Sequence, residues 1–289
     1  MKLLYKALFS WFFLLYCISF IGKNGQAENK PVNLKPFPLV ETGNTVIVPP
    51  KGVHPFYKKY INADGIIIVS SDNVPDAALI AARKTVLYVL IKRPDVHKAM
   101  LRYDPRISIM AISEKASDLP EFGPRDDGQW GLGQRPGDPT ALVSEKGVCY
   151  EGNREYIANF LLHEFVHMMH NLAIKTNDPG VSAEIYAAYL NAVKKGFFTP
   201  PKKEVLEGIA PFRGYGVDEY FTHSVNAWYN LNESLPGIWM DFKIGEWGPR
   251  SGTKKELKQR NPAIYKIISR YFPESGGDII KPCNPVKKH

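Results

Sequence analysis

The stretch His163-Glu164-Phe165-Val166-His167 decides how this chain is interpreted. Its two histidines are four residues apart within a segment, 154–174, whose apolar residues recur with helical periodicity. Residues four apart lie on one face of a helix, so both imidazoles can point at a single metal ion. This spacing is typical of zinc, which binds histidine nitrogen at about 2.0–2.1 Å. The sequence therefore predicts a zinc-binding helix.

Glu164 directly follows the first histidine and lies about 100° around the helix, beside the metal rather than on it. Zinc lowers the pKa of bound water towards ~7, so a neighbouring carboxylate can accept the proton of that water. We therefore expect Glu164 to be the general base of a hydrolytic reaction.

A catalytic zinc needs a third protein ligand and an open position for water. His170 follows His167 by three residues but lies about one turn, ~5 Å, further along the axis, which makes it an awkward ligand. Glu184 and Glu219 come 17 and 52 residues after His167, each in a later predicted helix. Spacing alone leaves these two glutamates nearly equal as candidates.

Strands are predicted before the zinc-binding helix. Apolar runs predict strands over 65–70, 106–112 and 140–144, with a helix over 76–91 between the first two. This order suggests two neighbouring strands with the helix packed on one face. We expect Thr140–Ser144 to be the sheet edge that receives a substrate as an added strand.

The rest of the chain completes an α+β pattern, with a small sheet early and helices late. The predicted regions are an extended lead-in over 28–53, a long irregular stretch over 115–139, and helices over 180–195, 217–230 and 254–271. With 289 residues, of which 44% are hydrophobic and 23% charged, the composition excludes disordered, collagen-like and coiled-coil proteins. We expect residues 28–289 to form a single domain.

The N-terminus has the pattern of a secretion signal. Lys2 and Lys6 precede an apolar run over 7–22, and Gly25-Gln26-Ala27 offers a small-x-small cleavage site. The run has 16 residues, whereas a bilayer span needs about 20. We predict a signal peptide over 1–27, a secreted or periplasmic (cell-envelope) protein, and no stable membrane insertion after the signal is removed. An uncleaved anchor is the alternative.

Charge and cysteines limit the partners. Without residues 1–27 the chain keeps 34 basic and 29 acidic residues, a net charge of +5, and no basic stripe, so nucleic acid is not expected. Cys149 and Cys283 are then the two remaining cysteines. An oxidising compartment favours one disulfide between them, and two buried free thiols are the alternative.

Several motifs in the same order resemble a known family. They are Trp130-Gly131-Leu132-Gly133, the motif helix through His170, Glu219-Tyr220-Phe221, and Glu256-Leu257-Lys258 before Asn261-Pro262. Over residues 125–272 the chain resembles gluzincin metallopeptidases with a lethal-factor-like catalytic core, and secreted proteins that share this core. The resemblance implies a zincin-like fold, a protein or peptide substrate, and Glu219 as the third zinc ligand.

The chain departs from this pattern four residues after Glu219, where the family usually carries a second acid and this chain has His223. An acid there would orient a zinc-bound histidine through its second nitrogen. His223 can instead be neutral and accept that bond, or bind nothing and serve as a packing or surface residue.

The family also uses a tyrosine upstream of the ligand glutamate to donate a hydrogen bond to the developing oxyanion. Position 212 is Phe, but Tyr215 lies between Gly214 and Gly216, and a loop there would present the phenol to the cleft. Tyrosine is a neutral donor at pH 7, which suits charge that appears only in the transition state. We expect Tyr215 to be this donor.

These features predict a zinc metallopeptidase in which His163, His167 and Glu219 bind Zn²⁺ and Glu164 and Tyr215 are catalytic. Two alternatives remain open. One is a cell-envelope module that binds zinc without catalysis, which His223 favours. The other is a zinc hydrolase of a non-protein amide, since the metal chemistry would be the same.

Overall fold

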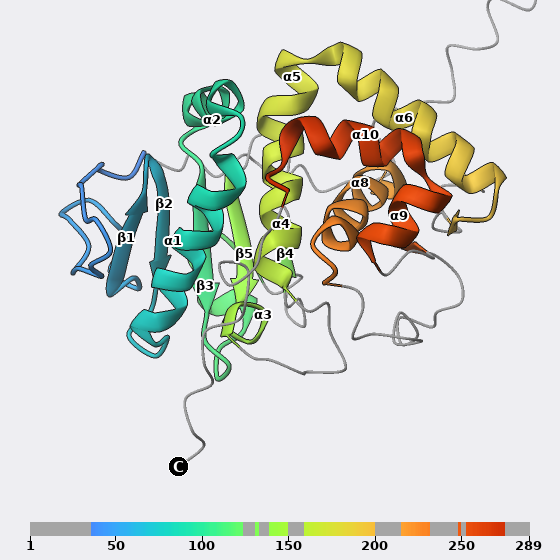
Figure 1. Cartoon of the computed structure of the whole chain (residues 1–289). Coiled ribbons are helices and arrows are strands. Elements are labelled where there is room, and N and C mark those ends of the chain that lie inside the picture. The colour runs from blue at the N-terminus through green and yellow to red at the C-terminus, as the bar shows by residue number, and fades with distance from the viewer. Residues whose placement is uncertain are drawn as a thin grey trace, which may run out of the picture. The chain divides into compact units, whose positions relative to one another are not determined.

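A computed structural model describes residues 36–123, 131–132, 139–149, 159–199, 215–231, 248–249 and 253–274. The elements described here belong to one compact unit, residues 33–289. Together they form a mixed α+β structure (Figure 1). The predicted signal peptide over 1–27 and Cys283 lie outside the described residues, as does the Cys149 side chain, so the disulfide remains a prediction.

Five strands form the main sheet in the order β1-β2-β3-β5-β4. Strands β2, β3 and β5 are parallel, while β1 and β4 pair antiparallel with their neighbours. The strand bounds are Lys59–Ala63 (β1), Ile66–Ser70 (β2), Arg106–Met110 (β3), Gly131–Leu132 (β4) and Thr140–Ser144 (β5). A separate pair joins β6, Phe198–Thr199, to β7, Gly248–Pro249.

Helix α1 connects β2 to β3, as the strand–helix–strand prediction requires. It spans Asp76–Leu90 and packs against β1 and β2. Ile68, Ile107 and Val143 belong to the main core, together with buried residues of α1 and α4. Val69 and Leu142 point to the opposite face, where they pack in two smaller apolar clusters. The sheet is buried on both faces, which explains why its strands are apolar runs instead of alternating patterns.

Strand β1 was not predicted from the sequence, although its turn carries a recognisable signal. Asp64 and Gly65 connect β1 to β2 with φ angles of 53° and 90°. Positive φ at both central residues is the geometry of a type I′ hairpin turn, for which Asp-Gly is a preferred sequence. The extended lead-in joins the same edge through a bridge between Ile47 and Tyr60.

The motif helix begins later than predicted. Asn159 is a non-helical N-cap whose side chain accepts a hydrogen bond from Leu162 N at 2.8 Å, so α4 starts at Phe160 and not at residue 154. Beyond α4 the chain stays helical past residue 174, as far as Asn177. The segments are α4 (Phe160–Met169), the π-helical turn η4 (His170–Ile174) and α5 (Lys175–Asn177).

Helix α4 lies between the sheet and the later helices, in contact with both β5 and α8 (Figure 1). Every residue from Leu161 to Met169 is buried. A helix buried all round needs neighbours on every side, and α4 also contacts α1, α2, α3 and β4. The motif residues are therefore held by a helix that is enclosed on all sides.

The later helices agree with the predicted order, with one interruption. Asn261-Pro262 divides the predicted helix 254–271 in two, because proline cannot donate to the helical ladder and starts a new helix. The remaining bounds are α2 (Pro94–Met100), η1 (Leu101–Tyr103), η2 (Ala116–Asp118), α3 (Lys146–Cys149), α6 (Pro179–Lys194), α8 (Tyr215–Trp228), α9 (Lys254–Arg260) and α10 (Pro262–Tyr271).

The expectation that Thr140–Ser144 is the sheet edge is wrong. Its Leu142 and Val143 pair with Leu132 and Gly131 of β4, so β4 lies outside β5. The short β4 comes from the irregular stretch 115–139, which offered no apolar periodicity from which to predict a strand. Within the described part of the chain, none of the helices combines the length and apolar character needed to cross a bilayer.

Candidate metal centre

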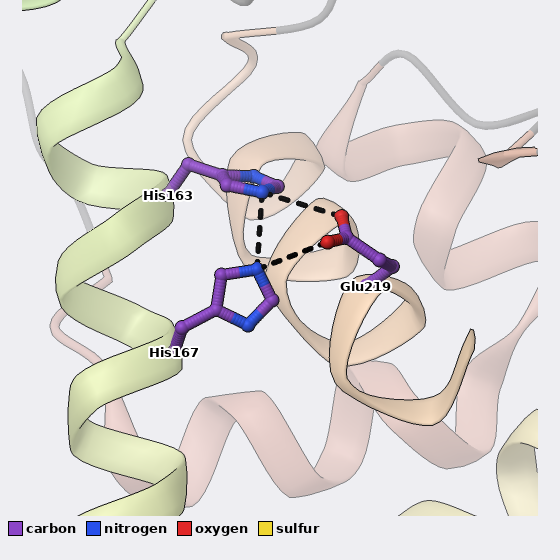
Figure 2. A group of neighbouring side chains, drawn as sticks. All are labelled: His163, His167 and Glu219. Atoms are coloured by element: carbon purple, nitrogen blue, oxygen red, sulfur yellow. Dashed lines mark hydrogen bonds and ion pairs between the residues drawn. The ribbon is translucent and has the colours of Figure 1, made fainter. Parts of the chain in front are cut away.

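Three buried side chains converge between α4 and α8: His163, His167 and Glu219. Figure 2 shows both imidazoles projecting from α4 towards the carboxylate carried by α8. The Nε2 atoms of His163 and His167 are 3.2 Å apart. Each lies 3.3 Å from one oxygen of Glu219, His163 from Oε2 and His167 from Oε1. This group can hold a metal ion.

The separation of the two imidazole nitrogens fits a tetrahedral ion. Ligand atoms placed about 2.0–2.1 Å from a tetrahedral metal lie about 3.3–3.4 Å from one another. The 3.2 Å between the two Nε2 atoms is close to this value. The two 3.3 Å distances end on different oxygens of Glu219, and with one ligand atom from each residue the three atoms lie within 4.8 Å of one another. Among the described residues the group offers three ligands, and three protein ligands with one open position for water is the arrangement of catalytic zinc sites.

The charges of the group are coupled. Burial opposes the charge on Glu219, but the neighbouring His167 and His163 outweigh it and hold the pKa of Glu219 well below its usual range. Burial likewise opposes charge on His167, yet Glu219 raises the pKa of His167 to about 9. Burial dominates at His163, whose pKa falls to about 3. In the metal-free protein near pH 7, His167 is therefore a charged imidazolium and His163 a neutral imidazole, and both contact the Glu219 carboxylate.

Glu164 is also buried, with 5% of its surface exposed. Burial raises the pKa of its carboxyl group to about 8, with Glu219 adding to the shift and His167 opposing it. No described residue donates a hydrogen bond to this carboxyl group. A carboxylate in this environment has an increased affinity for a proton near neutral pH, as a general base requires.

The two other candidates for third ligand lie elsewhere. Glu184 is an exposed residue of α6 and forms an ion pair with Arg270 at 2.6 Å. His170 is buried in η4, where its Nδ1 lies 3.0 Å from Asp218 Oδ1. Asp218 also receives Lys175 Nζ at 2.6 Å. His170 thus helps to join η4 to α8 and is turned away from the metal group.

Tyr215 is the first residue of α8, and Gly216 is the second, so the expected loop presentation of this tyrosine is wrong. Because α8 begins four residues before Glu219, Tyr215 lies one turn before Glu219 on the same helix. The Tyr215 side chain, together with Phe212 and Gly214, lies outside the described residues.

His223 is buried on α8, with 1% exposure, and is not a surface residue. Its Nε2 lies 3.4 Å from Glu219 Oε2, and its ring centroid lies 4.8 Å from that of His163. His223 therefore faces the carboxylate of the metal group.

Two residues outside the sequence motif contact the second nitrogens of the histidines. Thr222 Oγ1 lies 3.2 Å from His167 Nδ1, and Asn226 Nδ2 lies 3.4 Å from His163 Nδ1. Both are completely buried. The spacing of Thr222 and Asn226 in the sequence is the signal that predicts them, because residues three and seven after Glu219 lie on the same helix face as Glu219.

Comparisons of the chain with protein-family models, with curated proteins and with solved structures find no match.

Proposed function

We propose that this chain is an exported zinc-dependent peptidase with a zincin-like α+β fold. The observation that carries the proposal is the convergence of the His163 and His167 Nε2 atoms, 3.2 Å apart, on the buried Glu219 carboxylate, a group that can hold a metal ion. A donor set of two imidazoles and one carboxylate favours zinc among the common divalent metals. The resemblance of the motif order to lethal-factor-like gluzincins supports the same conclusion.

Glu164 carries the proton chemistry in this proposal. Zn²⁺ at the site supplies Lewis acidity, which polarises a carbonyl oxygen and lowers the pKa of water. Glu164 accepts a proton from the attacking water and later delivers it to the departing amine. In the metal-free protein, burial raises its pKa to about 8, which increases the affinity of the carboxylate for the proton that it accepts. Tyr215, near the start of α8, is the proposed donor to the oxygen that becomes negative in the transition state.

The direct test replaces Glu164 with Gln, which keeps the shape of the side chain and removes its basicity. We expect peptide hydrolysis to fall by about 10²–10⁴-fold, the usual contribution of a positioned acid–base group. Zinc content should stay at one ion per chain. Glu184→Gln is a matched control, because this exposed glutamate lies away from the metal group, and its activity should equal wild type. Wild-type activity in zinc-loaded Glu164→Gln would remove Glu164 from the mechanism.

The proposed role of Tyr215 has its own test. Tyr215→Phe removes only the phenolic oxygen. Loss of one oxyanion donor should lower kcat by about 10²–10³-fold while zinc binding is unchanged. An unchanged kcat would exclude Tyr215 as the donor.

A module that binds zinc without catalysis is the second candidate, and the position of His223 favours it. Its Nε2 lies 3.4 Å from Glu219 Oε2, close enough to compete with a metal ion for the carboxylate. Incubating the zinc-loaded protein with peptide libraries and cell-wall fragments, with a chelator-treated control, separates the candidates. Chelator-sensitive cleavage of peptides supports a peptidase, cleavage of cell-wall amides alone supports a different hydrolase, and no cleavage supports the binding module.

A further inference from the structure

The hydroxyl group of Thr222 restricts where His167 can carry its proton. Thr222 Oγ1 donates to the carbonyl oxygen of Asp218 at 2.7 Å, one turn earlier on α8. A hydroxyl group has a single hydrogen, so Oγ1 can then only accept a hydrogen bond from His167 Nδ1, 3.2 Å away. His167 must therefore carry a proton on Nδ1, and its Nε2 can provide a lone pair to the metal position.

Asn226 faces His163 in the corresponding way. Its Nδ2 lies 3.4 Å from His163 Nδ1, while its Oδ1 is buried and has no hydrogen-bond partner among the described residues. A half-turn of the amide exchanges these two atoms and brings the acceptor oxygen to Nδ1. That orientation satisfies the buried oxygen and places the proton of His163 on Nδ1, which leaves Nε2 as a metal ligand.

We propose that Thr222 and Asn226 are positioning residues that hold both histidines in the Nδ1–H form, so that each Nε2 is directed at the metal. The proposal rests on the metal centre proposed above. It accounts for the departure from the family pattern at His223: the orienting contacts come from the residues three and seven after Glu219, not from an acid four after it. Both contacts lie on the α8 face that carries Glu219, so one helix supplies the third ligand and orients the other two.

The zinc-loaded wild-type protein provides the first test. Long-range ¹H–¹⁵N correlation spectra of ¹⁵N-histidine protein distinguish protonated, unprotonated and metal-bound ring nitrogens. We expect His163 and His167 each to show a protonated Nδ1 and a metal-bound Nε2. A ring protonated on Nε2, or bound to zinc through Nδ1, would overturn the proposal. This measurement needs no variant to fold.

Variants then measure the effect of each contact on zinc affinity by competition with a chromogenic chelator. Thr222→Val and Asn226→Leu keep the size of the side chain and remove the acceptor, and each should weaken zinc binding by about 10–100-fold. Thr222→Ser and Asn226→Asp keep an acceptor oxygen. Thr222→Ser should bind zinc with an affinity within a few-fold of wild type, and Asn226→Asp, which introduces a carboxylate, should bind it at least as tightly.

Ser224→Ala is the matched control for Thr222→Val. Ser224 Oγ is buried on the same helix and donates to Tyr220 O at 2.7 Å, as Thr222 does to Asp218, but it does not touch a histidine of the metal group. Its zinc affinity should equal wild type. If folded Thr222→Val and Asn226→Leu bind zinc as tightly as Ser224→Ala does, the positioning role is overturned and the metal centre is not. A wild-type protein that binds no zinc would instead overturn the metal centre and, with it, the proposed function.

Discussion

His223 Nε2 lies 3.4 Å from Glu219 Oε2, one turn further along α8, and both side chains are buried. A nitrogen at this distance can donate a hydrogen bond to the carboxylate and limit its rotation. Glu219 is thus flanked by His163 and His167 on α4 and by His223 on its own helix. The carboxylate orientation is therefore set from two helices before any metal binds.

The first prediction follows from this contact. His223→Leu removes the donor to Glu219 and should weaken zinc binding by about 10-fold, the lower end of losses for groups that orient a ligand. His223→Gln retains an N–H donor and should bind more tightly than the Leu variant. Chelator competition at pH 7 checks the order. Zinc binding that is tighter in His223→Leu than in wild type would indicate that His223 competes with the metal for the carboxylate.

The second prediction compares the acidic candidates. Glu219→Ala should remove a ligand and reduce zinc binding below that of every variant with an altered orienting residue. Glu184→Ala should keep wild-type zinc content and change the free energy of unfolding by less than about 1 kcal/mol, because its ion pair with Arg270 is exposed. Zinc analysis after dialysis checks both. Loss of zinc from Glu184→Ala, with retention by Glu219→Ala, would reverse the assignment.

His170→Ala tests the remaining ligand candidate in the same assay. This side chain contacts Asp218 and not the metal group, so its removal should lower stability with little direct effect on zinc. Removing this buried side chain should cost about 0.5–3 kcal/mol, while Asp218 keeps its contact with Lys175. Urea unfolding measures this loss, and a zinc-free but otherwise stable His170→Ala protein would contradict the prediction.

The third prediction concerns the stability of the metal-free protein between pH 6.5 and 8. Folding raises the pKa of His167 from 6.5 to about 9 and that of Glu164 from 4.5 to about 8, so the folded state holds more protons than the unfolded state throughout this interval. Stability therefore falls as the pH rises, by on the order of 1 kcal/mol per pH unit for each group.

The opposite shift at His163 does not offset this fall. Its lowered pKa, about 3, makes stability increase only up to about pH 6.5, where the unfolded imidazole has lost its proton. Urea unfolding of chelator-treated protein at pH 6.5, 7.25 and 8 measures the slope, and Glu164→Gln should make it less steep. A free energy of unfolding that rises across this interval would contradict the pKa directions of both groups.

The fourth prediction tests how α4 is held at its start. A Cβ atom on Gly147 of α3 would overlap Phe160 Cβ, at the first residue of α4. Gly147→Ala should therefore move α3 or α4 apart and destabilise the protein by about 1–3 kcal/mol. Gly123→Ala is the control, because a Cβ there meets no atom of the described residues within 4 Å. Thermal unfolding compares them, and equal melting temperatures for the two variants would show that α3 and α4 can separate without cost.

The sequence by itself predicts the features that depend on local geometry. Histidines four residues apart share a face in any α-helix, so the pairing of His163 with His167 needs no tertiary information. The apolar runs of β2, β3 and β5 and the periodicity of α1 predict the strand–helix–strand unit for the same reason. The signals for β1 and for the break at Pro262 are also local, in Asp64-Gly65 and in Asn261-Pro262.

Tertiary structure alone decides which distant side chains meet the motif helix. Glu184 and Glu219 are chemically identical, and spacing does not separate them. The difference is that α8 packs along the histidine face of α4, whereas Glu184 on α6 points to the surface beside Arg270. The same packing directs Thr222 and Asn226 at the histidines. Contacts between helices depend on how complete apolar faces fit together, and the positions of single residues along the chain do not contain that information.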